Sequence, residues 1–349
     1  MPIIAKMKAI LRIFRSMPVC FVAFLAVASC DKKAGYQELT GYAQGGTYSV
    51  KFNHDGVKAG MSEIKRAVDS ILTLVDTTLS GYNKGSQLSR FNAGKPVTPN
   101  EMFKEIFTAS KRLYDETGGA LDMASGALYD VWGFGFTNDS LPTDAVVDSL
   151  KVVCGMDKFD MNMSPLVPGI CPKLNFNAIA QGYTCDKIAE YLHSLGVKDM
   201  LVNIGEIYCE GLNPSGKPWT IGVDMPVDGN MELGGQGLVG KWQGNGSGCG
   251  VVTSGNYRKF YVKDGRKYSH TIDPRTGYPV NHTLLSATIV APDATMADAY
   301  ATYCMVIGLD EAKRFIESLD ELEGYLVYDD GGSMSEWASS GFNLVRDSR

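Results

Sequence analysis

The sequence lacks several features that mark common classes of protein. Its eight cysteines and four histidines form no Cys-x-x-Cys motif and no Cys/His cluster, so a structural zinc site is not expected. It has no internal repeat and no low-complexity tract, and beyond residue 30 no apolar stretch approaches the length of a membrane span. The class that remains is a globular body of one large or two small domains.

Basic residues are also scarce. Lysine and arginine number 33 against 39 aspartates and glutamates, and the first 29 residues hold four of the basic residues and none of the acidic ones. Without those 29 residues the chain has 29 basic and 39 acidic residues, a net charge of −10. Because such a chain repels a polyanion, nucleic acid is not expected as a partner.

The N-terminus has the features of a lipoprotein signal peptide. Four basic residues precede an apolar run over residues 17–28, which is too short to span a bilayer comfortably. The run ends in Val27-Ala28-Ser29-Cys30, which resembles a lipobox, where diacylglycerol is attached to the cysteine thiol. An ordinary signal peptide followed by a chance cysteine is the alternative. We expect a lipid on Cys30 that anchors the protein in the lipid bilayer, facing the periplasm.

This interpretation divides the chain into a signal peptide (residues 1–29), a membrane-proximal tether (30–40) and a folded body (41–349). Within the body, apolar residues at helical spacing predict a helix over 61–75 and a second helix capped by Asn100. Helices and strands interleave irregularly, which favours an α+β fold over a doubly wound sheet. Strands are expected at residues 217–223, 250–254, 258–262, 268–272, 285–291 and 325–328.

Six cysteines remain once Cys20, in the leader, and Cys30 are set aside. Exported proteins meet oxidising surroundings, so a bridge between Cys154 and Cys171 is conceivable. We favour the other interpretation, in which scattered buried thiols act as small hydrophobic side chains.

Two segments place polar groups at strand ends. Residues 268–279 (YSHTIDPRTGYP) crowd His270 and Asp273 into a turn whose backbone is fixed by proline and glycine, which suits a site or a structural turn equally well. Upstream, Thr253 and Ser254 follow an apolar strand, where hydroxyls and amides can meet phosphate oxygens. A plain strand-to-turn junction is the commoner explanation of that pattern.

Two further segments lie at helix starts. Asp298 and Thr302 are four residues apart on one helix face, so a carboxylate and a hydroxyl can address the same hard cation. Alternatively, this is a polar face on which Thr302 bonds back to a backbone carbonyl. Residues 175–186 (NFNAIAQGYTCD) indicate a helix start whose free amides suit an anion, although an ordinary capped helix fits equally.

Together these segments resemble the ApbE family of FAD:protein FMN transferases, in the family's order and over essentially the whole body. Residues 46–50 (GTYSV) resemble its opening strand, 82–92 (YNKGSQLSRFN) its S-x-L-S-R-x-N segment, 119–135 (GALDMASGALYDVWGFG) its GAFDPT…LWGFG segment, and 269–277 (SHTIDPRTG) its S-H-x-I-D-P-x-T-G fingerprint. The resemblance implies an α+β fold of mixed or antiparallel sheets with packed helices, and an FAD site between two sub-domains.

The resemblance also implies roles for individual residues. Mg²⁺ would be held by the Asp298 carboxylate, the Thr302 hydroxyl and the Ala178 carbonyl, all of them oxygen ligands. His270 would accept the proton of the acceptor hydroxyl, with Asp273 as a second catalytic candidate. The alternative is that His270 only fixes the turn or orients Asp273. The expected FAD contacts are Gly45, Tyr82, Ala120, Leu121, Asp122, Asn175, Gln181, Thr253, Ser254, Ile272 and Thr276.

The implied reaction is Mg²⁺-dependent cleavage of FAD, in which AMP leaves and FMN passes to a Thr or Ser hydroxyl of an extracytoplasmic flavoprotein. Subunits of Rnf or of sodium-pumping NADH:quinone oxidoreductase are the expected acceptors. An FAD pyrophosphatase and a non-catalytic FAD-binding lipoprotein are the alternatives.

The chain departs from the family pattern on the flavin side. Asn175 and Gln181 stand where the family has an aspartate and a lysine, Met123 and Ala124 replace a proline and a threonine, and Glu206 replaces a glycine. Exchanging both charged groups for neutral amides keeps hydrogen bonds and leaves no charge unpaired. We therefore expect FAD affinity, rather than metal binding, to differ from that of relatives.

Overall fold

The fold is seen in a computed structural model. It describes residues 35–135, 141–166, 171–228, 237–257, 260–263 and 265–346. The expected signal peptide and the lipidation site at Cys30 lie outside the described residues. Within them, no helix has the length and apolar character needed to cross a membrane.

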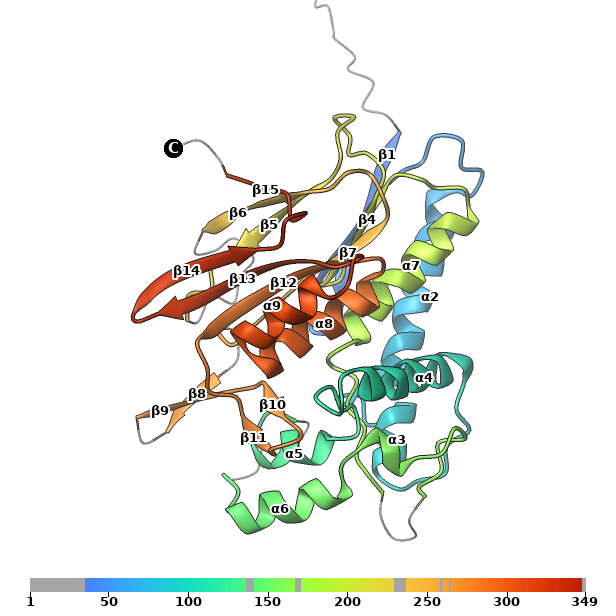
Figure 1. The fold of residues 1–349 in the computed structure, drawn as a ribbon. Helices are drawn as coiled ribbons and strands as arrows, with labels where there is room; N and C mark the ends of the chain where they lie inside the picture. The colour runs from blue at the N-terminus through green and yellow to red at the C-terminus, as the bar shows by residue number, and fades with distance from the viewer. Residues whose placement is uncertain are drawn as a thin grey trace, which may run out of the picture. The chain divides into compact units, whose positions relative to one another are not determined.

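An eight-stranded sheet in the order β1-β2-β3-β4-β7-β12-β13-β14 runs through the molecule (Figure 1), and every pair of neighbouring strands is antiparallel. This arrangement, with helices between the strands in sequence, confirms the predicted α+β class. The strands are β1 (Tyr36–Ala43), β2 (Gly46–Asn53), β3 (Met200–Asn203), β4 (Ile207–Glu210), β7 (Cys249–Gly255), β12 (Leu284–Ala291), β13 (Glu323–Asp330) and β14 (Ser333–Ala338).

Both faces of this sheet are covered. Four helices pack on one face, and a three-stranded sheet of order β15-β6-β5 packs on the other. On β7, Val252 faces the helices while Val251 faces the small sheet, as expected where successive side chains alternate. The covering elements are α2 (Met61–Leu79), α7 (Ala180–Ser194), α8 (Ala294–Ile307), α9 (Leu309–Glu317), β5 (Thr220–Asp224), β6 (Leu238–Gln243) and β15 (Leu344–Val345).

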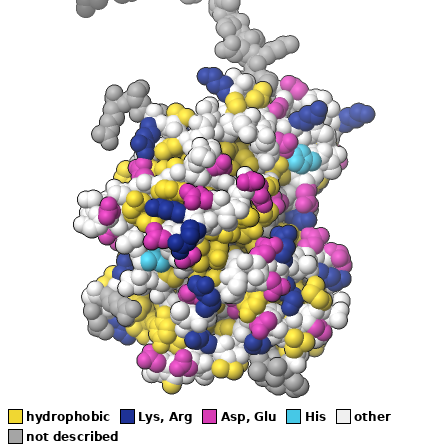
Figure 2. Space-filling model, in the orientation of Figure 1, with side chains coloured by type: hydrophobic (Ala, Val, Ile, Leu, Met, Phe, Trp, Pro, Cys, Tyr) yellow, Lys and Arg dark blue, Asp and Glu magenta, His cyan; other side chains and the backbone are white. Residues whose placement is uncertain are grey.

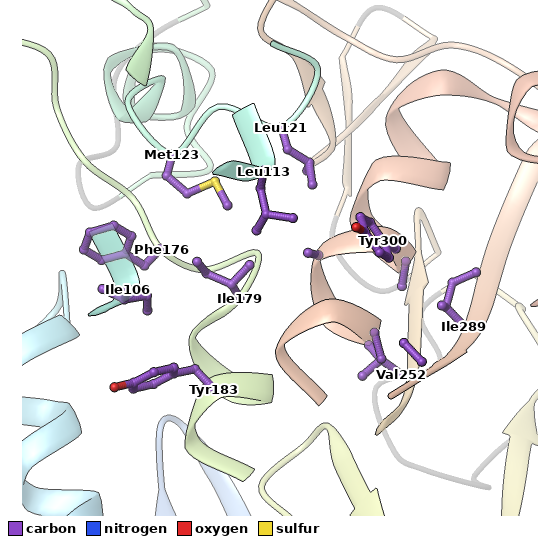
Figure 3. Packing of buried hydrophobic residues seen from close by; sticks show 14 of the residues in the cluster. Ile106, Leu113, Leu121, Met123, Phe176, Ile179, Tyr183, Val252, Ile289 and Tyr300 are labelled. Carbon is purple, nitrogen blue, oxygen red and sulfur yellow. The ribbon is translucent and has the colours of Figure 1, made fainter. Parts of the chain in front are cut away.

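The remaining elements form a mostly helical region, drawn below the large sheet in Figure 1. Its core is continuous with that of the sheet: Leu121, Met123 and Ile179 belong to the same hydrophobic cluster as Val252 and Ile289 (Figure 3). The elements are α3 (Gln87–Asn92), α4 (Glu101–Glu116), α5 (Gly126–Val131), α6 (Asp144–Val153), the 3₁₀ turn Met156–Lys158, and the hairpins β8 (Phe260–Lys263) with β9 (Arg266–Ser269) and β10 (Ile272–Asp273) with β11 (Tyr278–Pro279).

The predicted elements agree with the structure except at some boundaries. Both predicted helices are confirmed, and the Asn100 side chain accepts the Phe103 amide at 2.9 Å as a cap. The strand expected over 268–272 is interrupted, since β9 ends at Ser269 and β10 begins at Ile272. Residues 258–259 of another expected strand lie outside the described residues, and β8 begins at Phe260.

The structure corrects the expected tether. Residues 36–40 fall within β1, where Tyr36 pairs with Asn53 and Thr40 with Ser49. The Leu39 side chain explains why these residues join the sheet, because it is buried against the core between β2 and α2. A tether can therefore include only residues before Tyr36.

Candidate functional site

The predicted metal ligands lie where α7 begins against α8. Asp298 is 4% exposed, and its Oδ2 accepts the Gly182 amide at 3.0 Å. This contact requires glycine, since a Cβ on residue 182 would lie 2.1 Å from the Ala294 carbonyl oxygen. Close approach of the two helices therefore places the Asp298 carboxylate at the first turn of α7.

The Ala178 carbonyl takes no part in the regular hydrogen bonds of α7. Helix α7 begins at Ala180 with Ile179 as its N-cap, and the Tyr183 amide donates to the Ile179 carbonyl at 2.9 Å. Ala178 precedes this cap, and the Gly182 amide, one of the free amides of the first turn, donates to Asp298. The Ala178 carbonyl is therefore not committed to the helix and can serve as a ligand.

Thr302 and Ser254 complete this group. Thr302 is one helical turn beyond Asp298 on α8, and its hydroxyl lies 3.4 Å from that of Ser254 at the end of β7. Thr253 faces the opposite side of the sheet, where its hydroxyl lies 2.8 Å from that of Thr288. The structure therefore brings Ser254 to the metal candidates but does not bring Thr253 there.

The electrostatics of this group suit a cation. Burial raises the pKa of Asp298 well above its usual value, and the nearby charges of Glu206 and Asp186 raise it further. A bound cation would offset the free-energy cost of ionising that buried carboxylate. Among the described residues, no three His, Cys, Asp or Glu side chains are grouped to hold a metal. One carboxylate with a hydroxyl and a carbonyl is instead an all-oxygen set of the kind Mg²⁺ prefers.

Two positioning residues had no role in the sequence interpretation. Asp186 on α7 accepts the backbone amides of Ala294 and Thr295, both at 2.8 Å, and so joins α7 to the N-terminus of α8. Asn92, in the S-x-L-S-R-x-N segment, holds both backbone groups of Leu174, at 2.7 Å to the carbonyl and 2.8 Å to the amide. The S-x-L-S-R-x-N segment offered a sequence signal for Asn92. Asp186, at the end of residues 175–186, was given no role from the sequence.

The two substituted flavin-side residues both bond to backbone. Asn175 is 7% exposed, and its backbone amide donates to the Met123 carbonyl at 2.7 Å. Its side-chain Oδ1 accepts the Asn177 backbone amide at 3.0 Å. Gln181 Nε2 donates to the Ile204 carbonyl at 3.0 Å. Aspartate and lysine could form these same side-chain bonds, so this chain keeps the hydrogen bonds without the charges.

Besides Asn175, four of the expected FAD contacts are buried. The side chains of Ala120, Leu121 and Ile272 are core, at 1%, 3% and 0% exposed, so only their backbone could meet a ligand. Asp122 is also buried, and its Oδ1 accepts the amides of Ala124 at 2.9 Å and Met156 at 3.0 Å. Burial raises the pKa of Asp122 to about 7.

Gly45 and Tyr82 lie on the surface. Gly45 occupies the β1–β2 turn at φ +83°, and its neighbour Gln44 donates to the Thr184 hydroxyl on α7 at 2.6 Å, which brings that turn to α7. Tyr82 is 67% exposed and so is not a core anchor. An exposed aromatic ring can stack on a flat ligand.

The turn between β10 and β11 is built from local contacts. Asp273 accepts the Arg275 amide, Nε and Nη2, each at 2.9 Å, and its carbonyl accepts the Gly277 amide at 2.7 Å. The Thr276 hydroxyl also donates to that carbonyl, at 3.2 Å. Asp273 and Thr276 therefore shape the turn, while the half-buried His270 lies with its ring edge-on to Phe134, 6.4 Å between centroids.

This turn is fastened to the helical region. Trp132, which follows α5, donates its ring nitrogen to the Gly277 carbonyl at 2.8 Å, and the Tyr278 hydroxyl donates to Asp144 on α6 at 2.6 Å. Ile272 packs in the same small core as Trp132. These contacts hold the segment between β9 and β10, which carries His270, in a fixed position.

A profile of the ApbE family matches residues 44–326. The chain belongs to the ApbE family. It is 32% identical to the FAD:protein FMN transferase of Vibrio cholerae over 336 residues, which cover 94% of this chain and 98% of the relative. The Escherichia coli K12 FAD:protein FMN transferase is 32% identical over 82% of this chain and 83% of its own.

Solved ApbE structures show the same fold. The flavin transferase ApbE from Vibrio cholerae superposes with a TM-score of 0.75 at 30% identity, covering 88% of this chain and 98% of that one. The apo form of the Pseudomonas stutzeri flavinyl transferase ApbE gives 0.74 at 29% identity, covering 87% and 95%. These likenesses confirm the ApbE-like α+β fold expected from the sequence.

A surface cavity of about 610 Å³ lies between the turn and α8–α9 of this ApbE chain. Charged and apolar side chains adjoin one another on this face (Figure 2). None of Asp298, Thr302 and His270 lines this cavity, so the cavity is not assigned to FAD. Its lining residues are Arg275, Tyr303, Ile307, Glu311, Arg314, Phe315 and Ser318.

Proposed function

We propose that this chain is an FAD:protein FMN transferase that uses Mg²⁺. The observation that carries the proposal is the Gly182–Asp298 contact, which holds a buried carboxylate at the first turn of α7, just after Ala178. The family relatives are named for this activity. Asp298, Thr302 and Ala178 would hold the ion, which would neutralise charge on the FAD pyrophosphate and on the leaving AMP.

The chain's own residues would align the substrates. The oxygen of the acceptor hydroxyl attacks the FMN phosphorus, the bond to the bridging oxygen breaks, and AMP leaves with that oxygen. Ser254, within reach of Thr302, is placed to contact a phosphate oxygen, and Tyr82 to stack on the flavin ring. His270 accepts the hydroxyl proton, since imidazole titrates near neutrality and the adjoining turn is fixed by Asp273 and Arg275.

The acceptors and the location are part of the same proposal. The acceptor side chain is a Thr or Ser of an extracytoplasmic flavoprotein, with subunits of Rnf and sodium-pumping NADH:quinone oxidoreductase as candidates. A lipid on Cys30 would anchor the protein to the bilayer on the periplasmic side. Support for this location comes from the basic and apolar residues that precede Cys30.

Mass spectrometry of an acceptor domain tests the activity. The protein is incubated with FAD, Mg²⁺ and the acceptor, which is then weighed, and nucleotides are separated. FMN on the acceptor supports transfer, whereas AMP and free FMN with an unmodified acceptor would favour the pyrophosphatase. Tightly bound FAD without products would overturn both enzymatic readings in favour of a flavin-binding lipoprotein.

The role of His270 is tested separately. His270→Gln removes the base but keeps a polar side chain, so we expect the transfer rate to fall about a hundredfold or more. The pH dependence of the rate distinguishes a base from a structural group, because only loss of a base removes the acidic limb of the profile. An unchanged profile would assign His270 to holding the turn.

A further inference from the structure

Cys209 and Cys249 lie directly opposite each other on neighbouring strands. The β4–β7 ladder pairs Ile207 with Val251, Tyr208 with Gly250 and Cys209 with Cys249. Directly opposed residues of an antiparallel pair have Cα atoms about 4.5–5.5 Å apart, within the roughly 4.4–6.8 Å that a disulfide spans. The strand register therefore places the two sulfurs within reach of each other.

The two thiols have different surroundings. Cys209 is 2% exposed and packs in the core beneath the small sheet with Trp219, whereas Cys249 is partly exposed at the edge of that core. A hydrogen bond from the Cys209 thiol lowers the pKa of Cys249, while the same bond and burial raise the pKa of Cys209. Cys249 is thus both the accessible sulfur and the one more readily present as a thiolate.

The other described cysteines lack such a partner. All six described cysteines are free thiols in the structure, Cys209 and Cys249 included. Cys154 is buried at the end of α6 and Cys171 is exposed outside any strand, so neither belongs to a strand pair. The Cys185 thiol donates to the Glu206 carbonyl at 3.1 Å, and Cys304 is fully buried. Among the described cysteines, the strand register opposes only Cys209 and Cys249.

We infer that Cys209 and Cys249 are an oxidation site at which a disulfide forms across β4 and β7. The oxidant is a disulfide, supplied by a thiol–disulfide oxidoreductase or by oxidised glutathione; the predicted export of the chain would expose it to such oxidants. The Cys249 thiolate attacks one sulfur of the oxidant and expels a thiolate. Cys209 then loses its proton and attacks the Cys249 sulfur, expelling the second thiolate. Two protein thiols are oxidised by two electrons, and the oxidant is reduced to two thiols.

The bond would join two strands that lead to the site. Ile204, just before β4, accepts the Gln181 side chain, and Ser254, at the end of β7, lies beside Thr302. The disulfide would also close the segment between the two cysteines, which contains β5 and β6. Closing a loop of that length restricts the unfolded chain, so the oxidised protein should melt about 5 °C or more above the reduced one.

Peptide mapping of the full chain tests the inference. The reduced protein is treated with oxidised glutathione, unfolded, alkylated with N-ethylmaleimide and digested. The expected product is a peptide pair joined through Cys209 and Cys249, two hydrogens lighter than the separate peptides, with Cys154, Cys185 and Cys304 alkylated. Alkylation of both Cys209 and Cys249, a pairing with another thiol, or glutathione retained on Cys249 would overturn it.

A matched pair of variants gives a second readout. In Cys249→Ala the difference in melting temperature between oxidised and reduced protein should vanish, whereas it should persist in Cys304→Ala, which removes a buried thiol that has no opposed cysteine. A redox-dependent difference that survives in Cys249→Ala would contradict the inference. The peptide map of the unsubstituted protein decides the matter even where a variant folds poorly.

Discussion

The α7–α8 junction and the turn between β10 and β11 are held by different kinds of contact. At the junction, Gly182 and Asp298 are 116 residues apart in sequence, and Asp186 and Thr295 are 109 apart. In the turn, Asp273 bonds Arg275, two residues away, and the arginine is exposed. The proposed metal site thus depends on the packing of distant segments, whereas the turn near the proposed base is shaped by local bonds and fastened to the helical region through Gly277 and Tyr278.

This difference predicts how each region responds to substitution. Changes at the junction should alter folding and metal binding together, unless they preserve shape. Changes in the turn should alter the reaction rate with little effect on stability, because exposed local contacts contribute little to the free energy of unfolding. The four substitutions below test this contrast.

Asp298→Asn separates charge from shape at the junction. The amide keeps an oxygen for the Gly182 hydrogen bond but removes the charge of the proposed metal ligand, so we expect transfer to fall about a thousandfold or more with little loss of stability. Mg²⁺ should raise the melting temperature of the unsubstituted protein and not that of the variant. The control is Asp320→Asn, at an exposed carboxylate. Equal stabilisation of both variants by Mg²⁺ would rule out this site.

Asp122 gives an intermediate case, a buried carboxyl held by backbone amides. Its pKa in the folded protein is about 7, against 3.8 ordinarily. Between about pH 4 and 7 the folded state therefore keeps a proton that the unfolded state has lost. This group therefore stabilises the fold fully below pH 4, and that contribution is lost as pH rises to 7. Three pKa units correspond to roughly 4 kcal/mol at most.

Asp122→Asn tests that pH dependence. The amide resembles the protonated carboxyl and keeps Oδ1 for the Ala124 and Met156 amides. Urea unfolding at several pH values should show that the decline in stability between pH 4 and 7 is much shallower in the variant. Parallel curves for the two proteins would mean that Asp122 titrates normally.

Gly182→Ala tests whether the junction depends on close packing. A Cβ 2.1 Å from the Ala294 carbonyl forces α7 and α8 apart, so we expect a loss of about 2–3 kcal/mol in the free energy of unfolding and loss of transfer. Gly46→Ala is the matched control, because a Cβ there meets nothing within 4 Å. Urea denaturation compares the two. A Gly182→Ala variant as stable as the control would show that the helices are free to move apart.

The same contrast explains what the sequence could predict. Helix α4 and its Asn100 cap were predictable because both signals are local. The Gly182–Asp298 contact was not, because no local pattern joins residues so far apart. Only the family resemblance grouped Ala178 with Asp298 as expected metal ligands. Strand β1 was missed because only Leu39 is buried along it, which gives no alternating pattern.

The two faces of β7 show a further limit. Thr253 and Ser254 were predicted together, yet only Ser254 faces α8. In a half-exposed strand, alternation of polar and apolar residues would have separated them. Because β7 is covered on both faces, its run of valines carries no such alternation, and the direction of each hydroxyl had to come from the tertiary structure.

Arg275→Lys tests the turn, and we expect it to have the smallest effect of the four substitutions. A lysine ammonium is a point charge and cannot reproduce the two-pronged bond from Nε and Nη2 to Asp273. The Arg275 backbone amide and the Gly277 amide still hold the turn, so we expect stability to change by less than about 1 kcal/mol. Transfer should fall by less than about tenfold, because the adjoining His270 is positioned less firmly. A loss of stability as large as that of Gly182→Ala would contradict the contrast between the two regions, since it would make the turn as dependent on tertiary packing as the helix junction.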